Sequence, residues 1–442
     1  KIAYITAGAA GMFCGSCMHD NTLARALIKL GHDVTLVPLY TPIRTDETAI
    51  AIDRVFFGGI NVYLQQKSAL FRWLPRWADR WLNSPTLIRL ATSYGISVEA
   101  KALGALAVSM LQGSHGQLKK EVESLAAWLA NDVQPDIINF SNMLMAGSIP
   151  EIKRQRNVPI VVTLQGDDIF LNDLIEPYKS QALAEIKQLD ASVDAYLVNS
   201  DYYADHMAKF LDLPRAKFFR VPLGIDVQDL AEIDRAGQIT RPPTIGYLAR
   251  LAPEKGLHLL VDAFLQLKEQ PGLADARLHV AGWLGAPNKP YAEAQFAKVR
   301  AAGHGAALQY HGEVDRAGKL AFLREIDLLS VPTTYREPKG LFVLEALAAG
   351  VPVVQPDHGA FPELLASTGG GRLVRANDAG HLAEELASLL NNPVERAALA
   401  QAGRAAVLDH HHAQTIAQQT ITAFERLLKQ PLPTLPASVG ST

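Results

Sequence analysis

Short runs of β-branched and aromatic residues alternate with amphipathic segments along nearly the whole chain, and this alternation constrains the fold more than any other feature. Strands that alternate with helices are typical of βαβ units around a parallel sheet. The first series of expected strands covers residues 2–6, 34–37, 60–64, 137–140, 160–164, 196–198 and 218–221. The second covers residues 244–247, 278–281, 308–311, 328–331 and 353–355. We therefore predict an α/β protein with two doubly wound, Rossmann-like domains.

The expected boundary between the two series lies in residues 223–243, which are polar, charged and poor in strand signals. We therefore expect one domain over residues 1–222 and a second domain that begins at residue 223 and reaches about residue 410. Residues 431–442 have no hydrophobic period and contain several Pro and Ser, so we expect a mobile tail there.

Composition excludes several classes of protein. The 42 Lys and Arg balance 45 Asp and Glu, so the chain lacks the basic excess of nucleic-acid-binding proteins. Two cysteines cannot form a disulfide framework. No apolar run reaches the roughly 20 residues that span a bilayer, and the first residues match a strand and not a secretory leader. We expect a cytoplasmic protein.

Residues 331–350 form the most informative stretch. They predict a strand end, a loop with Pro338 and Gly340, and a helix that starts near Leu341 and stops at Gly350. The first backbone N–H groups of such a helix, including that of Phe342, have no partner within it and point beyond the carboxyl end of the strand. Together with the helix dipole they make an anion site, for which a diphosphate is the natural ligand.

Two glutamates flank this anion site. Glu345 lies one turn into the helix, where it could accept hydrogen bonds from ribose hydroxyls, and Glu337 lies on the loop. The phrase Glu337-Pro-Lys-Gly-Leu-Phe-Val-Leu-Glu345, followed by Ala-Leu-Ala-Ala-Gly-Val-Pro-Val-Val, resembles the paired-glutamate signature of retaining family 4 glycosyltransferases of the GT-B fold. Gly246-Tyr-Leu-Ala-Arg-Leu-Ala-Pro-Glu-Lys-Gly256 is similar to that family's pyrophosphate-binding segment, with Arg250 and Lys255 as its two cations.

The resemblance implies two domains that face a cleft, with a last helix, within residues 411–430, that crosses back to the first domain. It implies transfer of a sugar, with retention, from a UDP- or GDP-linked donor to an unidentified glycan, lipid or small-metabolite acceptor, and no metal or cofactor. Glu337 would hold the donor sugar and stabilise developing positive charge, while the leaving diphosphate assists deprotonation of the acceptor. A GT-B epimerase and a non-catalytic nucleotide-sugar-binding protein are the alternatives.

The first domain resembles the family less closely. Residues 14–27 look like its Gly-rich loop and first helix, with Gly15 close to the donor and His19 where the family often has His. At the end of the expected strand over residues 160–164, the catalytic candidate Gln165 stands where the family usually has a second His, near the donor sugar. Glutamine can hydrogen-bond a sugar hydroxyl but cannot carry charge. Asp168, nearby, is an acceptor-binding candidate. It is not expected to bind a metal with Asp167, because adjacent side chains on a strand point apart.

Residues 67–92 combine Trp73, Trp77 and Trp81 with five basic residues and one acidic residue. Such a segment fits a packed helix, an acceptor-site lid in which Trp73 and Trp77 stack on sugar rings, or a peripheral contact with the inner face of the membrane. The preceding residues 58–64 resemble glycogen and starch synthases, which favours acceptor binding over membrane contact.

Two further motifs have simpler explanations. Cys14 and Cys17 form a C-x-x-C pair, which we interpret as two small residues in a tight loop rather than a redox pair. The run from His410 to His412 is expected at a solvated helix end. The donor sugar, the acceptor and the oligomeric state stay open.

Overall fold

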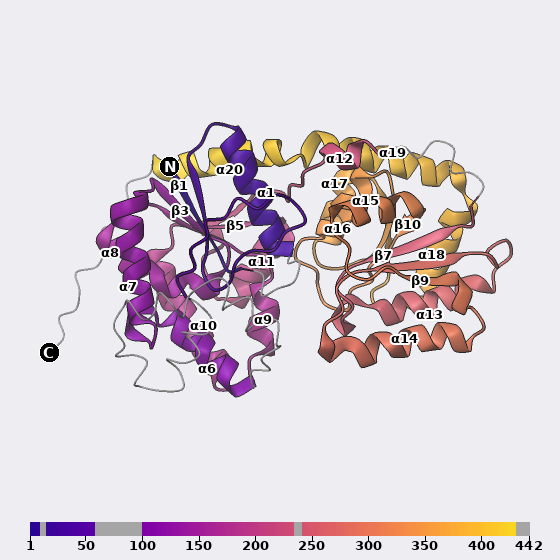
Figure 1. The fold of residues 1–442 in the computed structure, drawn as a ribbon, viewed down its shortest axis with the longest axis horizontal. Helices are drawn as coiled ribbons and strands as arrows, with labels where there is room; N and C mark the ends of the chain where they lie inside the picture. Colours follow the sequence, from indigo (N-terminus) through magenta and orange to yellow (C-terminus); the bar gives the residue numbers. More distant parts are fainter. Residues whose placement is uncertain (9–14, 58–99, 234–240, 430–442) are drawn as a thin grey trace. The chain divides into compact units, whose positions relative to one another are not determined.

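The computed structural model describes residues 1–8, 15–57, 100–233 and 241–429, which form two compact units (Figure 1). The first unit comprises residues 1–222 and 416–442, and the second comprises residues 223–415. Both are α/β units built on parallel sheets, as predicted. The predicted strand at residues 60–64 and the Trp-rich segment lie outside the described residues.

The sheet of the first unit has the order β2-β1-β3-β4-β5-β6. Its strands are β1 (Ile2–Thr6), β2 (Val34–Pro38), β3 (Ile137–Phe140), β4 (Ile160–Thr163), β5 (Ala195–Val198) and β6 (Phe218–Arg220). The α-helices are α1 (Gly15–Lys29), α6 (Ala100–Leu111), α7 (Lys119–Trp128), α8 (Ile149–Gln155), α9 (Asp167–Asp173), α10 (Tyr178–Leu189) and α11 (Asp201–Phe210). The strand order reverses between β1 and β3. All five residues of β1 are buried, as expected for a parallel sheet covered on both faces.

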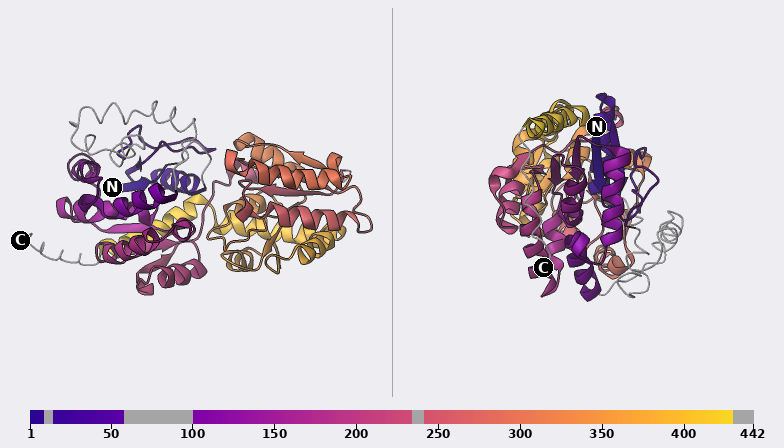
Figure 2. Two further views of the ribbon diagram at one scale, coloured as in Figure 1. Left: turned by 90° about the horizontal axis from the view of Figure 1, so that it is seen from below. Right: turned by 90° about the vertical axis from the view of Figure 1, so that its left-hand side faces the viewer.

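The sheet of the second unit has the order β12-β11-β10-β7-β8-β9. Its strands are β7 (Thr244–Leu248), β8 (Arg277–Ala281), β9 (Leu308–Tyr310), β10 (Leu328–Leu329), β11 (Val353–Pro356) and β12 (Gly371–Val374). The α-helices are α12 (Gln228–Ala231), α13 (Leu257–Lys268), α14 (Lys289–Ala301), α15 (Arg316–Glu325), α16 (Leu341–Ala348), α17 (Phe361–Thr368), α18 (Ala379–Asn391) and α19 (Pro393–His410). Helices α13 and α18 pack together on one face of this sheet, and α16 and α19 pack together on the other face (Figures 1 and 2). Both faces of the sheet are therefore covered. The strand order reverses between β7 and β10.

Helix α20 (Ala413–Leu428) ends the described chain, and its residues from Ile416 onward belong to the first unit. Ile416, Thr420, Phe424 and Leu427 are buried and share one face of this helix. Among the described residues, no helix combines the length and apolar character needed to cross a bilayer.

In the second unit the structure corrects one sequence-based expectation and adds one strand that was not predicted. The prediction of a solvated helix end is wrong for His411, which is buried and whose Nδ1 lies 2.8 Å from the carbonyl oxygen of Leu223. Its own carbonyl oxygen accepts a hydrogen bond from the backbone N–H of Ile225. Strand β12 was not predicted, because Gly371 and Arg372 carry little β propensity. Its place beside β11 supplies the pairing.

Candidate active site

The loops after β7 and β10 meet in the second unit because these two strands are neighbours at the reversal of strand order. Ligands of doubly wound folds bind outside the carboxyl ends of the strands at this point. Gly256, at the end of the β7 loop, has a φ of +74°, and a Cβ there would come within 1.8 Å of the carbonyl oxygen of Pro332 in the β10 loop. The two loops therefore approach so closely that only glycine fits.

An ion pair joins the same loops. Lys255, just before Gly256, donates a hydrogen bond of 2.8 Å from its Nζ to Oε2 of Glu337. The hydroxyl of Tyr335 donates to the same oxygen at 2.5 Å and also contacts Lys255 Nζ. Lys255 and Glu337 are 82 positions apart in the sequence and were predicted to belong to one site. The structure brings them into contact.

Glu337 is only 5% exposed. Burial raises its pKa, but the charge and hydrogen bond of Lys255, with the hydroxyl of Tyr335, outweigh burial and lower the pKa to about 2. The carboxylate is therefore ionised at any physiological pH. Its loop is fixed from the other side, because the backbone N–H of Ala360 donates to the carbonyl oxygen of Glu337 at 2.8 Å.

The first turn of α16 lies beside this pair. Gly340 precedes the helix with a φ of +78°, and no side chain caps the helix. The first N–H groups of α16, including those of Leu341 and Phe342, lack partners within the helix. Lys255 Nζ lies 5.9 Å from the ring centroid of Phe342, so a fixed positive charge and the positive end of a helix share one place.

The other predicted cation of the site, Arg250, follows β7 and is partly exposed. Its guanidinium lies 2.8 Å from Oε1 of Glu254. The backbone carbonyl of Glu254 in turn accepts a hydrogen bond of 2.9 Å from the N–H of Thr334. Glu254, which we did not single out from the sequence, therefore links Arg250 to the loop after β10.

Glu345 points to a different partner from Glu337. It is buried, and its Oε1 accepts a hydrogen bond of 2.6 Å from Nζ of Lys319 in α15, which is also buried. Nothing in the sequence signalled Lys319, because it belongs to another helix. The contact of Glu345 with ribose hydroxyls stays a prediction.

In the first unit, His19 and Gln165 lie around one buried carboxylate, that of Asp20. Gln165 Nε2 donates to Asp20 Oδ1 at 2.8 Å, and His19 Nδ1 lies 3.5 Å from the same oxygen. Thr6 and Tyr4 of β1 also donate to Asp20. The structure thus brings two predicted residues together around a third that sequence analysis missed.

Asp168, the predicted acceptor ligand, is in the first turn of α9. Its carboxylate accepts a hydrogen bond of 2.6 Å from the hydroxyl of Tyr203 and lies 3.1 Å from Nε2 of His206. Asp167, its neighbour, accepts hydrogen bonds from the backbone N–H groups of Met143 and Gln165. Burial raises the pKa of Asp167 to about 6.

The remaining candidates are placed only in part. Gly15 begins α1 and is partly exposed, and Cys17 in the same helix is buried. Cys14, Trp73 and Trp77 lie outside the described residues.

Comparison with known proteins identifies the family. The model described as "Glycosyl transferases group 1" matches residues 230–406, and "Glycosyltransferase Family 4" matches residues 109–229. The chain belongs to the family 4, group 1 glycosyltransferases. Its two doubly wound units are those of the GT-B fold.

Relatives and solved structures agree with this assignment. A phosphatidyl-myo-inositol mannosyltransferase of Mycobacterium leprae is 31% identical over 207 residues, 46% of this chain and 52% of that protein. The chain thus spans about half the length of the phosphatidyl-myo-inositol mannosyltransferases that it matches. A D-inositol 3-phosphate glycosyltransferase of Kribbella flavida is 27% identical over 83% of this chain and 90% of that protein.

Among solved structures, sucrose-phosphate synthase from Thermosynechococcus elongatus superposes with a TM-score of 0.68, at 18% identity over 96% of this chain and 98% of that one. Anabaena HepE, in complex with UDP and glucose, has a TM-score of 0.66 at 16% identity over 96% and 99% of the two chains. Both share the fold of this chain.

Proposed function

We propose that this glycosyltransferase moves a hexose from a UDP- or GDP-sugar to a hydroxyl-bearing acceptor with retention of anomeric configuration. The observation that carries the proposal is the buried pair of Lys255 and Glu337 beside the first turn of α16. A cation next to a helix N-terminus suits a diphosphate, and an ionised carboxylate beside both suits the sugar attached to it.

The reaction requires stabilisation of the negative charge that forms on the leaving group. As the bond between the sugar C1 and the diphosphate oxygen breaks, negative charge grows on the diphosphate. Lys255, Arg250 and the N–H groups of α16 would neutralise it, which makes a divalent metal unnecessary. Lys255 would then divide its three N–H donors between the diphosphate and Glu337.

Glu337 would stabilise the positive charge that forms on the sugar. The sugar becomes cation-like as C1 loses the diphosphate, and the ionised carboxylate stabilises it without forming a bond. The acceptor oxygen forms its bond to C1 on the face that the diphosphate leaves, and its proton passes to a diphosphate oxygen. Retention then follows without a covalent enzyme intermediate.

We assign acceptor binding to the first unit, with Asp168 and the segment containing Trp73 and Trp77 as candidates. The names of similar proteins define an acceptor panel, since they refer to phosphatidyl-myo-inositol, to D-inositol 3-phosphate and, for a glycogen synthase of Mycobacterium tuberculosis, to glycogen. A membrane-bound acceptor would give residues 67–92 a peripheral membrane contact.

The decisive experiment has two stages. In a thermal-shift screen with nucleoside diphosphates and nucleotide-sugars, we expect the ligands of one nucleotide base to raise the melting temperature. A ligand that binds only the folded state has this effect. Turnover of the stabilising donor is then measured with the acceptor panel, without added divalent metal, and NMR gives the anomeric configuration of the product.

Variants locate the reaction. Lys255→Ala and Glu337→Gln should each lower kcat/KM by about 10²–10³, the usual cost of removing one transition-state charge contact. Lys298→Ala is the matched control, because Lys298 also forms an ion pair in the second unit, with Asp262, but on an exposed surface. The proposal fails if no nucleotide shifts the melting temperature, or if the two site variants turn over like the control.

A further inference from the structure

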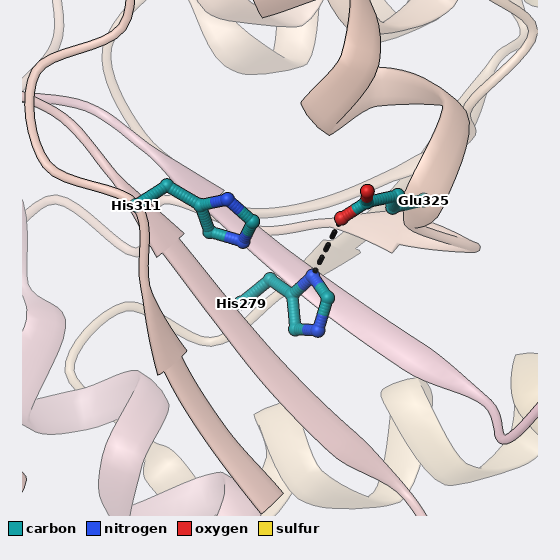
Figure 3. Close-up of side chains that lie close together, drawn as sticks. All are labelled: His279, His311 and Glu325. Atoms are coloured by element: carbon teal, nitrogen blue, oxygen red, sulfur yellow. Dashed lines mark ion pairs between the residues drawn. The ribbon is translucent and has the colours of Figure 1, made fainter. Parts of the chain in front are cut away.

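Two histidines and a glutamate lie together on the face of the second sheet that α15 covers (Figure 3). His279 is in β8, His311 directly follows β9, and Glu325 is the last residue of α15. One ligand atom from each lies within 4.8 Å of the other two. The cluster shares no residue with the proposed donor site.

The fold accounts for this meeting. Strands β8 and β9 are parallel, and His279 is in register with Gln309. Side chains two positions apart on a strand share a face, so His311 lies on the same side as Gln309 and His279. The ring of Phe322 from α15 packs edge-on against His311 with the centroids 5.4 Å apart, which places this helix, and Glu325 at its end, over both histidines.

The facing ring nitrogens have no hydrogen-bond partner among the described residues. These are Nδ1 of His279 and Nε2 of His311, which belong to rings with centroids 5.0 Å apart. His279 Nδ1 lies 3.5 Å from a carboxylate oxygen of Glu325, the contact dashed in Figure 3. His279 is 6% exposed, whereas half of the Glu325 side chain is exposed, which gives an ion a path from solvent.

We infer that His279, His311 and Glu325 form a binding site for a divalent transition-metal ion, with Zn²⁺ the best match. Imidazole nitrogens and a carboxylate oxygen are the ligands that Zn²⁺ prefers, and three of them leave one position for water. Bonds of about 2.0–2.2 Å in a tetrahedral site place ligand atoms about 3.5 Å apart. The contact between His279 and Glu325 already has that spacing.

Two arginines, Arg277 and Arg241, lie near His279, and the carboxylate of Glu325 supplies the negative charge of the site. Arg241 is itself paired with Asp327, at 2.9 Å. The metal would join the end of α15 to β8 and β9 and would stabilise the second unit, not take part in sugar transfer.

The test is a titration of the full chain after treatment with a chelator. Isothermal titration with Zn²⁺ should show one tight site, and Co²⁺ should give the visible absorption bands of a nitrogen- and oxygen-ligated ion. Glu325→Gln removes an exposed ligand at a helix end, so folding should be preserved. It should weaken Zn²⁺ binding at least about tenfold, and His311→Gln should do the same.

A double variant, His410→Gln with His412→Gln, is the matched control, because the three consecutive histidines are the obvious metal-binding candidate in the sequence. We expect it to keep the tight site and the Co²⁺ spectrum. The inference is overturned if the wild-type chain shows no one-to-one binding, if Glu325→Gln and His311→Gln bind like wild type, or if the control variant loses the site.

Discussion

Nζ of Lys319 donates a hydrogen bond of 2.6 Å to Oε1 of Glu345, and both side chains are buried. The pair joins α15 to α16, the helix whose first turn faces the proposed diphosphate. The two glutamates of the family signature therefore serve different partners: Glu337 binds the lysine of the β7 loop, and Glu345 binds a lysine on another helix.

Lys319→Met should destabilise the protein by about 3–5 kcal/mol, because it leaves the Glu345 carboxylate buried without its partner. Urea unfolding of the full chain measures the change. The double variant Lys319→Met with Glu345→Leu should recover most of the loss, since a buried ion pair is often replaceable by apolar side chains. If Lys319→Met were as stable as wild type, the ion pair would make no net contribution to the free energy of unfolding.

The parts of the site that lie in loops after adjacent strands were predictable from sequence. The resemblance to the family placed Lys255 and Glu337 in one site, and in the structure their loops follow two neighbouring strands, β7 and β10. Strand β1 was predicted to the residue, because its whole run is apolar or β-branched and buried on both faces.

The partners that complete the site were not predictable from sequence. Asp20 is bound by Gln165, 145 positions away, and only the topology of the first sheet brings them together. Lys319 looks like an ordinary surface lysine of an amphipathic helix until α16 covers it. The sequence around His411 predicts a solvated residue, whereas in the structure its ring nitrogen contacts the carbonyl oxygen of Leu223. Local periodicity contains no information about such distant contacts.

The raised pKa of Asp167 predicts a dependence of stability on pH. Its folded pKa, about 6, exceeds the usual value of 3.8, so the folded protein holds a proton that the unfolded chain releases. This contribution is complete below pH 3.8 and is lost as the pH rises through about 6. Relative to Asp167→Asn, the wild type should lose on the order of 2–3 kcal/mol between pH 4 and 7. Denaturant unfolding of both proteins across that range measures the difference, and a constant difference would contradict it.

Gln165 tests the network around Asp20. Gln165→Glu replaces an N–H donor with a second carboxylate beside a fully buried one, and like charges at such a distance cost several kcal/mol. Gln165→Met removes the donor without adding charge and is the matched control. We expect the glutamate variant to be the less stable of the two at pH 7. Equal unfolding free energies at pH 7 would exclude repulsion between these positions.

Gly359 tests how tightly the Glu337 loop is held. Its φ is +63°, and a Cβ there would come within 2.5 Å of the carbonyl oxygen and 2.6 Å of the nitrogen of Glu337. Gly359→Ala must therefore displace the backbone of Glu337 and break the hydrogen bond from Ala360. We expect a loss of stability beyond the roughly 1–2 kcal/mol cost of a left-handed alanine, and a loss of transferase activity.

Gly303→Ala separates the backbone cost from the steric clash, because Gly303 has a φ of +82° but no atom within 4 Å of the added Cβ. It should show the backbone cost alone and full activity. If the two variants lose the same stability and both retain activity, the loop carrying Glu337 has room to move and its position is not fixed by Gly359.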